Sequence, residues 1–291
     1  MKKGLVSVVT PVYNGESHIG RFLDSILAQD YPDVEMILSD DGSTDATVSA
    51  AASYAPAFDE KGYTFRIVRS THRNASAAIN AGLAYVNGEY LIWPDSDDEL
   101  LPGSIETRVQ FLREHPEFQC VRSIMEYVSV DGGPAPMGEK LGDLSHTDLF
   151  LDVLEIRTFV CCGCYMLRTE PFFEIYPERK IPVYDVGQNF QMLLPFLYKH
   201  RCQTLRQVLY RVHVRPDSHS KYALSESEER ERFRQFEFLV DEIAGICGIR
   251  DLTSRFRIFR WKMMRRLILL VKYGRFPCNL FAKVGLICLC R

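Results

Sequence analysis

Short apolar runs alternate with amphipathic stretches along the first third of the chain. Residues 5–9, Leu-Val-Ser-Val-Val, are nearly continuous and β-branched, which is typical of a strand buried on both faces of a parallel sheet. Apolar residues then recur at helical spacing from Ile19 to Leu27. The same alternation predicts further strands at 34–39, 65–68 and 90–93 and an alanine-rich helix at 75–86. Four such units favour an α/β fold with a mostly parallel, doubly wound sheet and flanking helices.

Acidic residues follow two of these strands. Asp40 and Asp41 end the second strand, and Asp95-Ser96-Asp97-Asp98 follows the fourth. The carboxyl ends of parallel strands meet at the edge where open α/β sheets bind ligands. Crowded carboxylates repel one another, and a hard divalent cation such as Mg²⁺ or Mn²⁺ relieves the repulsion and bridges to phosphates. The pattern predicts a metal-diphosphate site; the alternative is a solvated turn that caps the next helix.

Glycine-rich phosphate loops are absent from the sequence. Neither GxGxxG after the first strand nor GxxxxGK[ST] occurs, so neither a dinucleotide dehydrogenase nor a P-loop enzyme is supported. We therefore expect a nucleotide to be held by other groups. The carboxylate of Asp41 can accept hydrogen bonds from base N–H groups or ribose hydroxyls, and Tyr13 can stack on the base.

Composition adds few constraints. The 291 residues carry a net charge of −3, which gives no overall attraction for nucleic acid. The nine cysteines show no paired metal-binding spacing, which favours a reducing cytosol. Cys161, Cys162 and Cys164 lie in an apolar run and are interpreted as buried thiols in a strand. The apolar start is interpreted as a core strand rather than an export signal, and no segment is a convincing membrane span.

Four motifs in order carry a family resemblance. They are PVYN at 11–14, DDGSTD at 40–45, SAAINAG at 76–82 and DSDD at 95–98. Residues 4 to about 105 thereby resemble the family 2 glycosyltransferases, which have the GT-A fold. The resemblance implies a nucleotide-diphosphate sugar donor, a divalent metal and inversion at the anomeric carbon.

Donor-site residues are carried over from this resemblance by position. Pro11, Tyr13 and Asp41 match positions that line the nucleotide base. The DxD region that holds ribose and metal-diphosphate matches Asp95, Ser96, Asp97 and Asp98, with the metal assigned to Asp97 and Asp98. Asn74 is also placed at the donor site, where many relatives have glycine.

The general base that inverting transfer needs is not obvious. The family pattern of glycine, two acids, an aromatic residue and a third acid aligns with Gly187-Gln188-Asn189-Phe190-Gln191, where amides replace all three acids. A neutral amide cannot serve as a base. The preferred substitute is Asp185, brought in by a shifted helix start; the alternative is a solvated carboxylate. Two other interpretations stay open: Gln188 and Asn189 bind the acceptor sugar while another residue supplies the base, or the activity has been lost.

The middle and the end of this region contribute weaker predictions. Strands are expected at 118–123 and 125–130, and residues 131–147 are interpreted as a mobile flap. A strand at 208–213 precedes a loop that resembles the family's closing loop over the diphosphate. There His213 is predicted to ligate the metal, and Arg215 and His219 to bind the diphosphate.

A basic helical tail ends the chain. Residues 224–244 and a second stretch from Arg255 onward have helical periodicity. The second stretch carries an apolar stripe (Phe256, Phe259, Met263, Leu267 and Leu270) and several arginines and lysines. Such a helix can lie on an anionic membrane surface, with Trp261 near the headgroups. The alternative is a helix packed on the catalytic domain, and nucleic-acid binding is a weaker use of the same charge.

The sequence therefore predicts a metal-dependent inverting glycosyltransferase. Its expected parts are a nucleotide-sugar-binding half at 1–105, an acceptor-binding half at 106–222 and a helical, basic region at 223–291. The expected acceptor is a growing cell-surface glycan or a lipid-linked saccharide, and the expected location is the cytoplasmic face of the cell membrane. The alternatives are a non-catalytic nucleotide-sugar-binding scaffold of a polysaccharide assembly complex and, more remotely, a nucleotidyltransferase.

Overall fold

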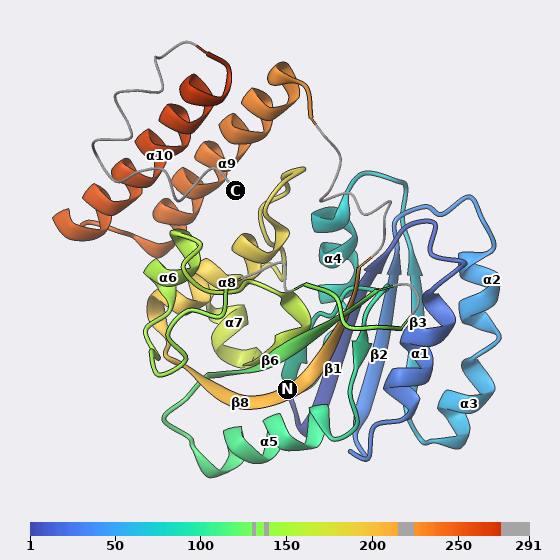
Figure 1. The fold of residues 1–291 in the computed structure, drawn as a ribbon. Coiled ribbons are helices and arrows are strands. Elements are labelled where there is room, and N and C mark those ends of the chain that lie inside the picture. The colour runs from blue at the N-terminus through green and yellow to red at the C-terminus, as the bar shows by residue number, and fades with distance from the viewer. Residues whose placement is uncertain (130–131, 137–139, 215–223, 275–291) are drawn as a thin grey trace. The chain divides into compact units, whose positions relative to one another are not determined.

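The computed structural model describes residues 1–129, 132–136, 140–214 and 224–274 (Figure 1). The chain divides into two compact units, Met1–Ser218 and His219–Arg291. The predicted division of the first unit into donor and acceptor halves stays a prediction. Each unit is described by itself below.

One eight-stranded sheet forms the centre of the first unit among the residues described. Its strands run in the order β3-β2-β1-β4-β7-β6-β8-β5. They are β1 (Lys2–Val12), β2 (Val34–Asp40), β3 (Thr64–Arg69), β4 (Gly88–Ile92), β5 (Glu99–Leu100), β6 (Cys120–Ser129), β7 (Tyr165–Arg168) and β8 (Cys202–Val214). The four strands from β3 to β4 are mutually parallel, whereas β7 and β5 pair antiparallel with their neighbours.

Helices flank this sheet (Figure 1). They are α1 (Ile19–Leu27), α2 (Thr47–Ala52), α3 (Ala55–Glu60), α4 (Ala75–Leu83), α5 (Ser104–Glu114), α6 (Phe150–Leu154), α7 (Thr169–Ile175) and α8 (Gln188–Lys199), with a short 3₁₀ turn, η1 (Cys162–Cys164). Helix α4 packs on β1, β2 and β3, and α5 packs on β6. The predicted α/β fold with a mostly parallel sheet and flanking helices is confirmed.

The apolar pattern explains the core. Every residue of β2 is buried, as expected for a strand covered on both faces. In α1, the residues at helical spacing, Ile19, Phe22, Leu23 and Ile26, are the buried ones. Burial of these apolar side chains is the main stabilising term for the layers.

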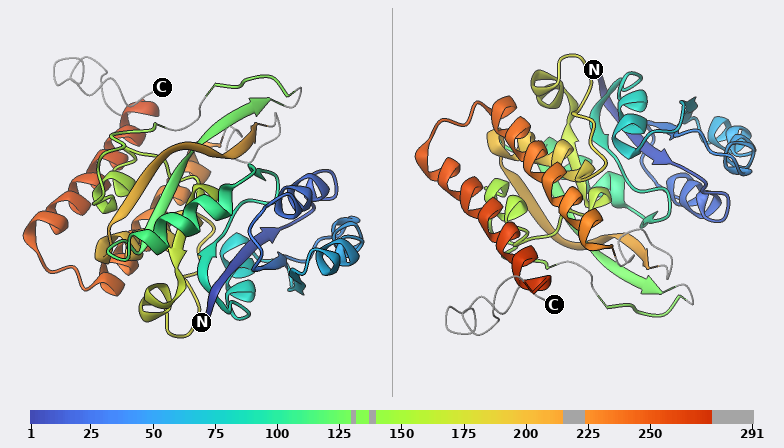
Figure 2. Two further views of the ribbon diagram at one scale, coloured as in Figure 1. Left: turned by 90° about the horizontal axis from the view of Figure 1, so that it is seen from below. Right: turned by 90° about the horizontal axis from the view of Figure 1, so that it is seen from above.

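Strands β6 and β8 run side by side as a curved parallel pair (Figure 2). The predicted pair of strands at 118–123 and 125–130 is wrong, because β6 runs without interruption from Cys120 to Ser129. Its register against β8 shifts around Ile124 instead. The curvature carries the end of β8 to β5, which follows the acidic cluster directly.

Two other boundaries differ from the predicted ones. The cysteine-rich run forms η1 before β7, so the strand predicted there begins only at Tyr165. Helix α8 begins at Gln188, so Asp185 precedes it and no shifted helix start occurs. The predicted mobile flap at 131–147 lies partly outside the described residues and stays a prediction.

The second unit is described from residue 224 to 274. Helix α9 (Glu226–Cys247) begins with a capping box made by Ser225 and Glu228. Helix α10 (Leu252–Lys272) is capped by Asp251 and packs on α9. Ion pairs join the helices at Arg266 with Glu237 (2.5 Å), at Lys272 with Glu229 (2.6 Å) and between Lys262 and Asp241.

One position of α10, Trp261, differs from the predicted pattern. Trp261 is buried, not exposed for headgroup contact, and the guanidinium of Arg265 lies 4.6 Å from its ring centroid. Phe256 and Phe259 of the predicted stripe are 64% and 59% exposed. None of the described helices combines the length and the hydropathy needed to cross a membrane.

Candidate active site

Loops at the carboxyl ends of β1, β2 and β4 bring the predicted donor residues to one edge of the sheet. Because these strands are adjacent and parallel, PVYN, DDGSTD and DSDD all begin at that edge. This is the common position of ligand sites in open α/β sheets.

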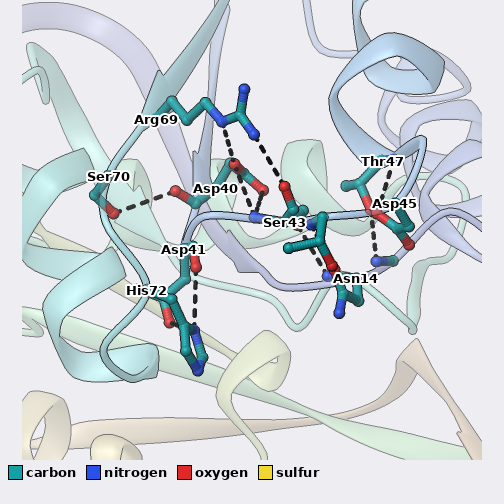
Figure 3. Close-up of polar contacts among 11 residues, drawn as sticks. Asn14, Asp40, Asp41, Ser43, Asp45, Thr47, Arg69, Ser70 and His72 are labelled. Carbon is teal, nitrogen blue, oxygen red and sulfur yellow. Dashed lines mark hydrogen bonds and ion pairs between the residues drawn. The ribbon is translucent and has the colours of Figure 1, made fainter.

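An aromatic and a carboxylate stand together on the β1 and β2 side. The rings of Tyr13 and His72 stack with their centroids 4.0 Å apart. Nδ1 of His72 lies 2.9 Å from Oδ2 of Asp41 (Figure 3). The backbone N–H of Arg73 donates to Oδ1 of Asp41 at 3.0 Å. Tyr13 is 44% exposed, so its stack with His72 remains accessible to a planar ligand.

Hydrogen bonds fix the DDGSTD turn to the preceding PVYN loop. The buried carboxylate of Asp40 accepts from the backbone N–H of Ser43 at 3.1 Å and pairs with Arg69 at 3.2 Å (Figure 3). Asn14, in the left-handed conformation that asparagine tolerates, donates its backbone N–H to Oγ of Ser43 and accepts from the N–H of Thr44, both at 2.9 Å. Hydrogen bonds thus join the PVYN loop to the DDGSTD turn. Pro11 is the penultimate residue of β1 and enters this loop.

The acidic cluster connects β4 to β5. Asp98 is 4% exposed, and both its carboxylate oxygens accept from protein groups: Oδ2 from the Tyr210 hydroxyl at 2.9 Å, and Oδ1 from the backbone N–H of His213 at 3.0 Å. Asp95 and Asp97 are half-buried, and Ser96 is buried. A guanidinium N–H of Arg21 donates to the carbonyl oxygen of Asp97 at 2.6 Å.

The electrostatics of this cluster suit a divalent cation. Burial, and then the charges of Asp97 and Asp95, raise the pKa of Asp98 well above its ordinary value. A hard cation relieves such repulsion and takes carboxylate oxygens as ligands. No group of three or more His, Cys, Asp or Glu side chains stands ready to hold a metal by itself within the ranges described. A cation here would need phosphate oxygens of the ligand to complete its shell, as Mg²⁺ sites commonly do.

The imidazole of His213, predicted as a metal ligand, lies beside Glu99, with Nε2 3.3 Å from Oε1. Burial and the neighbouring Arg21 lower the pKa of His213. Its backbone N–H donates to Asp98, and the metal role of its ring stays a prediction. Arg215 and His219 lie outside the described residues.

Asp185 and Asn74, predicted separately, meet in one hydrogen bond. The amide of Asn74 donates to Oδ1 of Asp185 at 2.7 Å, while its oxygen accepts from the backbone N–H of Ala77 and caps α4. Asn80 holds the same segment, because its side chain exchanges two hydrogen bonds with the backbone of Ile181, at 2.9 and 2.8 Å. The N-terminal end of α4 therefore holds Asp185, the predicted base.

The amides of Gln188 and Asn189 lie in the first turn of α8, after Gly187 in the left-handed conformation. Nε2 of Gln188 and Oδ1 of Asn189 are buried and have no hydrogen-bond partner among the described residues. Buried polar atoms without partners are costly, and a bound ligand can satisfy them.

Several residues at the site were not predicted from the sequence. His72, Arg21, Cys162 and Tyr210 all contact predicted site residues. Both His72 and Arg21 lie near a family motif in the chain, because Arg21 comes soon after PVYN and His72 shortly before SAAINAG. Tyr210 is 112 positions from Asp98 in the chain, and no local pattern connects the two.

Comparisons with known proteins agree with this architecture. The model of the family described as "Glycosyl transferase family 2" matches residues 7–175, more than half of the chain. The fold and the site define a glycosyltransferase of the GT-A type. The chain belongs to glycosyl transferase family 2.

Relatives and solved structures place the chain further. The protein named "Putative glycosyltransferase EpsE" of Bacillus subtilis strain 168 is 34% identical over 228 residues, which cover 76% of this chain and 77% of EpsE. Glycosyltransferase GlyA of Streptococcus pneumoniae serotype 4 is 33% identical over 43% of this chain, but only 17% of GlyA is covered.

Among solved structures, S. aureus TarS 1–349 in complex with UDP-GlcNAc has a TM-score of 0.66 at 20% identity, covering 90% of this chain and 72% of that one. The mannosyltransferase PcManGT of Pyrobaculum calidifontis, in complex with GDP-Man and Mn²⁺, has a TM-score of 0.60 at 19% identity, covering 98% and 80%. Likeness at this level of identity establishes the fold.

Gly42, in the DDGSTD turn, is a position where a side chain should destabilise the fold. It has φ +74°, and a Cβ built on it would lie 2.7 Å from the backbone nitrogen of His72. We expect Gly42→Ala to lower the free energy of unfolding by about 3 kcal/mol, from left-handed strain and overpacking together. Urea denaturation measures this loss.

Gly62→Ala is the matched control. Gly62 has nearly the same φ, +77°, but no atom within 4 Å of the added Cβ. This variant should lose only about 1 kcal/mol, the cost of the left-handed conformation. Equal losses in the two variants would contradict the close approach of His72 to Gly42.

Proposed function

We propose that this chain transfers a sugar, with inversion and with the help of Mn²⁺ or Mg²⁺, from a nucleotide-diphosphate sugar to a hydroxyl acceptor. The acceptor class is a growing cell-surface glycan or a lipid-linked saccharide. Sugar transfer of this kind needs a nucleotide site, a means of neutralising the leaving diphosphate and a base for the acceptor hydroxyl.

The observation that carries the proposal is the shared edge of β1, β2 and β4. The stacked Tyr13 and His72 with Asp41 offer a surface for a base and its N–H or ribose donors. The DSDD cluster begins at the same edge of the sheet and concentrates negative charge where a cation and diphosphate would lie. Within the cluster we assign metal contact to Asp97, because Asp98 already accepts from Tyr210 and His213.

Asp185 is the proposed general base. It is a carboxylate, it is exposed, and Asn74 holds one of its oxygens in place. That hydrogen bond ties the carboxylate to the N-cap of α4, and a carboxylate held there can take the proton of an attacking hydroxyl. Gln188 and Asn189, with their unpartnered amide atoms, are the proposed contacts to acceptor hydroxyls. The diphosphate roles of Arg215 and His219 stay predictions.

Contact with an anionic membrane is proposed for α10. Leu252, Phe256, Phe259 and Met263 follow one another at helical spacing and are 37–81% exposed. We call these four residues the α10 stripe. Lys262, Arg266 and Lys272 form ion pairs with acidic residues of α9, so their positive charges are largely compensated within the unit. The apolar stripe, more than the total basic charge, therefore supports interfacial binding.

A non-catalytic binding protein is the second candidate, because amides stand at positions 188 and 189. Membership of a glycosyltransferase family favours the enzyme. Release of free nucleoside diphosphate from a donor identifies a transferase, whereas release of pyrophosphate identifies a nucleotidyltransferase. Nucleotide binding without turnover of any donor would favour the scaffold.

Nucleotide binding is tested first by calorimetry with UDP, GDP, dTDP and CDP, each with Mn²⁺ or with chelator. We expect metal-dependent binding of one nucleotide, weakened at least about tenfold by Asp97→Asn, because loss of a carboxylate ligand weakens metal binding. Asp59→Asn changes an exposed acid of α3 and should bind as the native chain does. If no nucleotide binds in either condition, the donor site is refuted.

Asp185→Asn tests the base. The change keeps an oxygen that can accept from Asn74 but removes the basic carboxylate, so turnover should fall about 10²- to 10⁴-fold while donor affinity stays unchanged. Release of nucleoside diphosphate, with water or added saccharide as acceptor, measures turnover. Undiminished turnover would remove Asp185 from the mechanism. Restored turnover in Asp185→Asn with Asn189→Asp would show that the family's usual position still accepts a base.

The membrane proposal is tested with vesicles that contain an anionic phospholipid. The double variant Phe256→Ser with Phe259→Ser removes apolar area from the α10 stripe and should release the protein from vesicles in a co-sedimentation assay. Phe238→Ser, at an exposed phenylalanine of α9 that is 57% accessible, is the matched control and should leave binding intact. Equal binding by the double variant and the native chain would rule out the stripe as the anchor.

A further inference from the structure

Two buried side chains, Tyr210 and Cys162, contact the acidic cluster, and the proposed function gives neither a role of its own. Tyr210 of β8 is fully buried, and its hydroxyl donates to Oδ2 of Asp98 at 2.9 Å. The hydroxyl oxygen of Tyr210 in turn accepts from the backbone N–H of Asp95 at 3.2 Å. One hydroxyl therefore joins the first and last members of the cluster.

The identity of residue 163 follows from this tyrosine. A Cβ built on Gly163 would lie 2.0 Å from Cε2 and 2.1 Å from Cζ of Tyr210. Real Cβ contacts are never this short, so any side chain at 163 would push the ring away. The turn η1 thus packs directly against the ring and fixes the position of its hydroxyl.

Cys162, in the same turn, supports the cluster from a second direction. Its thiol is buried and makes a hydrogen bond with the side chain of Asp95. Burial raises the pKa of this thiol, so it stays protonated and donates to the carboxylate. Asp95 is therefore held through its backbone by Tyr210 and through its side chain by Cys162.

A buried arginine anchors the turn to α5. Arg108 is 0% exposed; its Nη1 donates to the carbonyl oxygen of Gly163 at 2.9 Å and its Nη2 donates to Oγ of Ser104 at 2.8 Å. A hydrogen bond from a buried cation is stronger than one between neutral groups. The turn that presses on Tyr210 and carries Cys162 is thereby fixed to the body of the unit.

We infer that Tyr210 and Cys162 are positioning residues that set the orientation of Asp95 and Asp98 for a nucleoside diphosphate and its divalent cation. Neighbouring carboxylates repel and would otherwise turn apart, whereas two donors from the interior hold these two acids while Asp97 remains half-buried at the surface. Neither Tyr210 nor Cys162 reaches the ligand; both act through the acids. The inference rests on the proposed nucleotide site.

The test measures metal-dependent nucleotide binding by calorimetry in four variants that are shown to be folded by circular dichroism. Tyr210→Phe keeps the ring but removes the hydroxyl, and Cys162→Ala removes the thiol. Each should weaken binding of the Mn²⁺-nucleoside diphosphate about tenfold, because a hydrogen bond to a charged group is lost. Cys162→Ser keeps a donor and should bind close to the native affinity.

Tyr165→Phe is the matched control for the tyrosine. Tyr165 is as buried as Tyr210, but its hydroxyl donates to the carbonyl oxygen of Phe159 at 2.8 Å and contacts no member of the acidic cluster among the hydrogen bonds of the described residues. The Tyr165→Phe variant should have a lower free energy of unfolding, as we also expect for Tyr210→Phe, but its nucleotide affinity should be unchanged. A purely structural role for Tyr210 would make the two variants alike in both measurements.

The outcomes separate this inference from the proposed function. Native binding with undiminished affinity in Tyr210→Phe and Cys162→Ala would overturn the inference alone. If Tyr210→Phe does not fold, the cysteine pair decides: equal weakening by Cys162→Ala and Cys162→Ser, or by neither, would overturn it. Failure of the native chain to bind any nucleotide would overturn the proposed function and this inference together.

Discussion

Mutual repulsion among Asp95, Asp97 and Asp98 is the constraint on which the site depends. Three carboxylates within four residues are unfavourable unless donors or a cation compensate them. The fold supplies donors from its interior, so Asp98 accepts from Tyr210 and from the backbone of His213. What remains is negative charge near the surface, and this is the property that a divalent cation and a diphosphate would require.

The sheet explains how those donors reach the cluster. Strands β1, β2 and β4 are adjacent and parallel, so the PVYN loop, the DDGSTD turn and the acidic cluster at their carboxyl ends lie at one edge of the sheet. Tyr210 and His213 come from β8, which is separated from β4 in the sheet by two other strands. The long, curved pair of β6 and β8 and the short strand β5 close this distance. The mixed part of the sheet, from β7 to β5, therefore completes a site that its parallel part begins.

The sequence predicted those features that arise from local periodicity or from motif order. The first four strands, the helices between them and the acids at strand ends follow from spacing along the chain. An apolar run, however, reads the same in a strand and in a buried turn, so η1 was predicted as strand. Two strands were predicted at 118–123 and 125–130 where the structure has one strand, whose register against β8 shifts near Ile124. The contact of Tyr210 with Asp98 spans 112 positions and leaves no periodic signal.

Two departures from the family pattern meet at the proposed base. Amides occupy the positions where relatives carry acids, at Gln188 and Asn189, and Asn74 stands where many relatives have glycine. A glycine at 74 would offer no side-chain donor, and an acid there would repel Asp185. Asparagine caps α4 with its oxygen and binds Asp185 with its nitrogen, so one side chain serves both. The carboxylate that is missing from α8 has a counterpart in Asp185, three residues before the helix. Asn74, which binds Asp185, is the N-cap of α4. This pairing fits a relocated base, because the hydrogen bond restricts the rotation of an exposed carboxylate that solvent alone would leave free to turn.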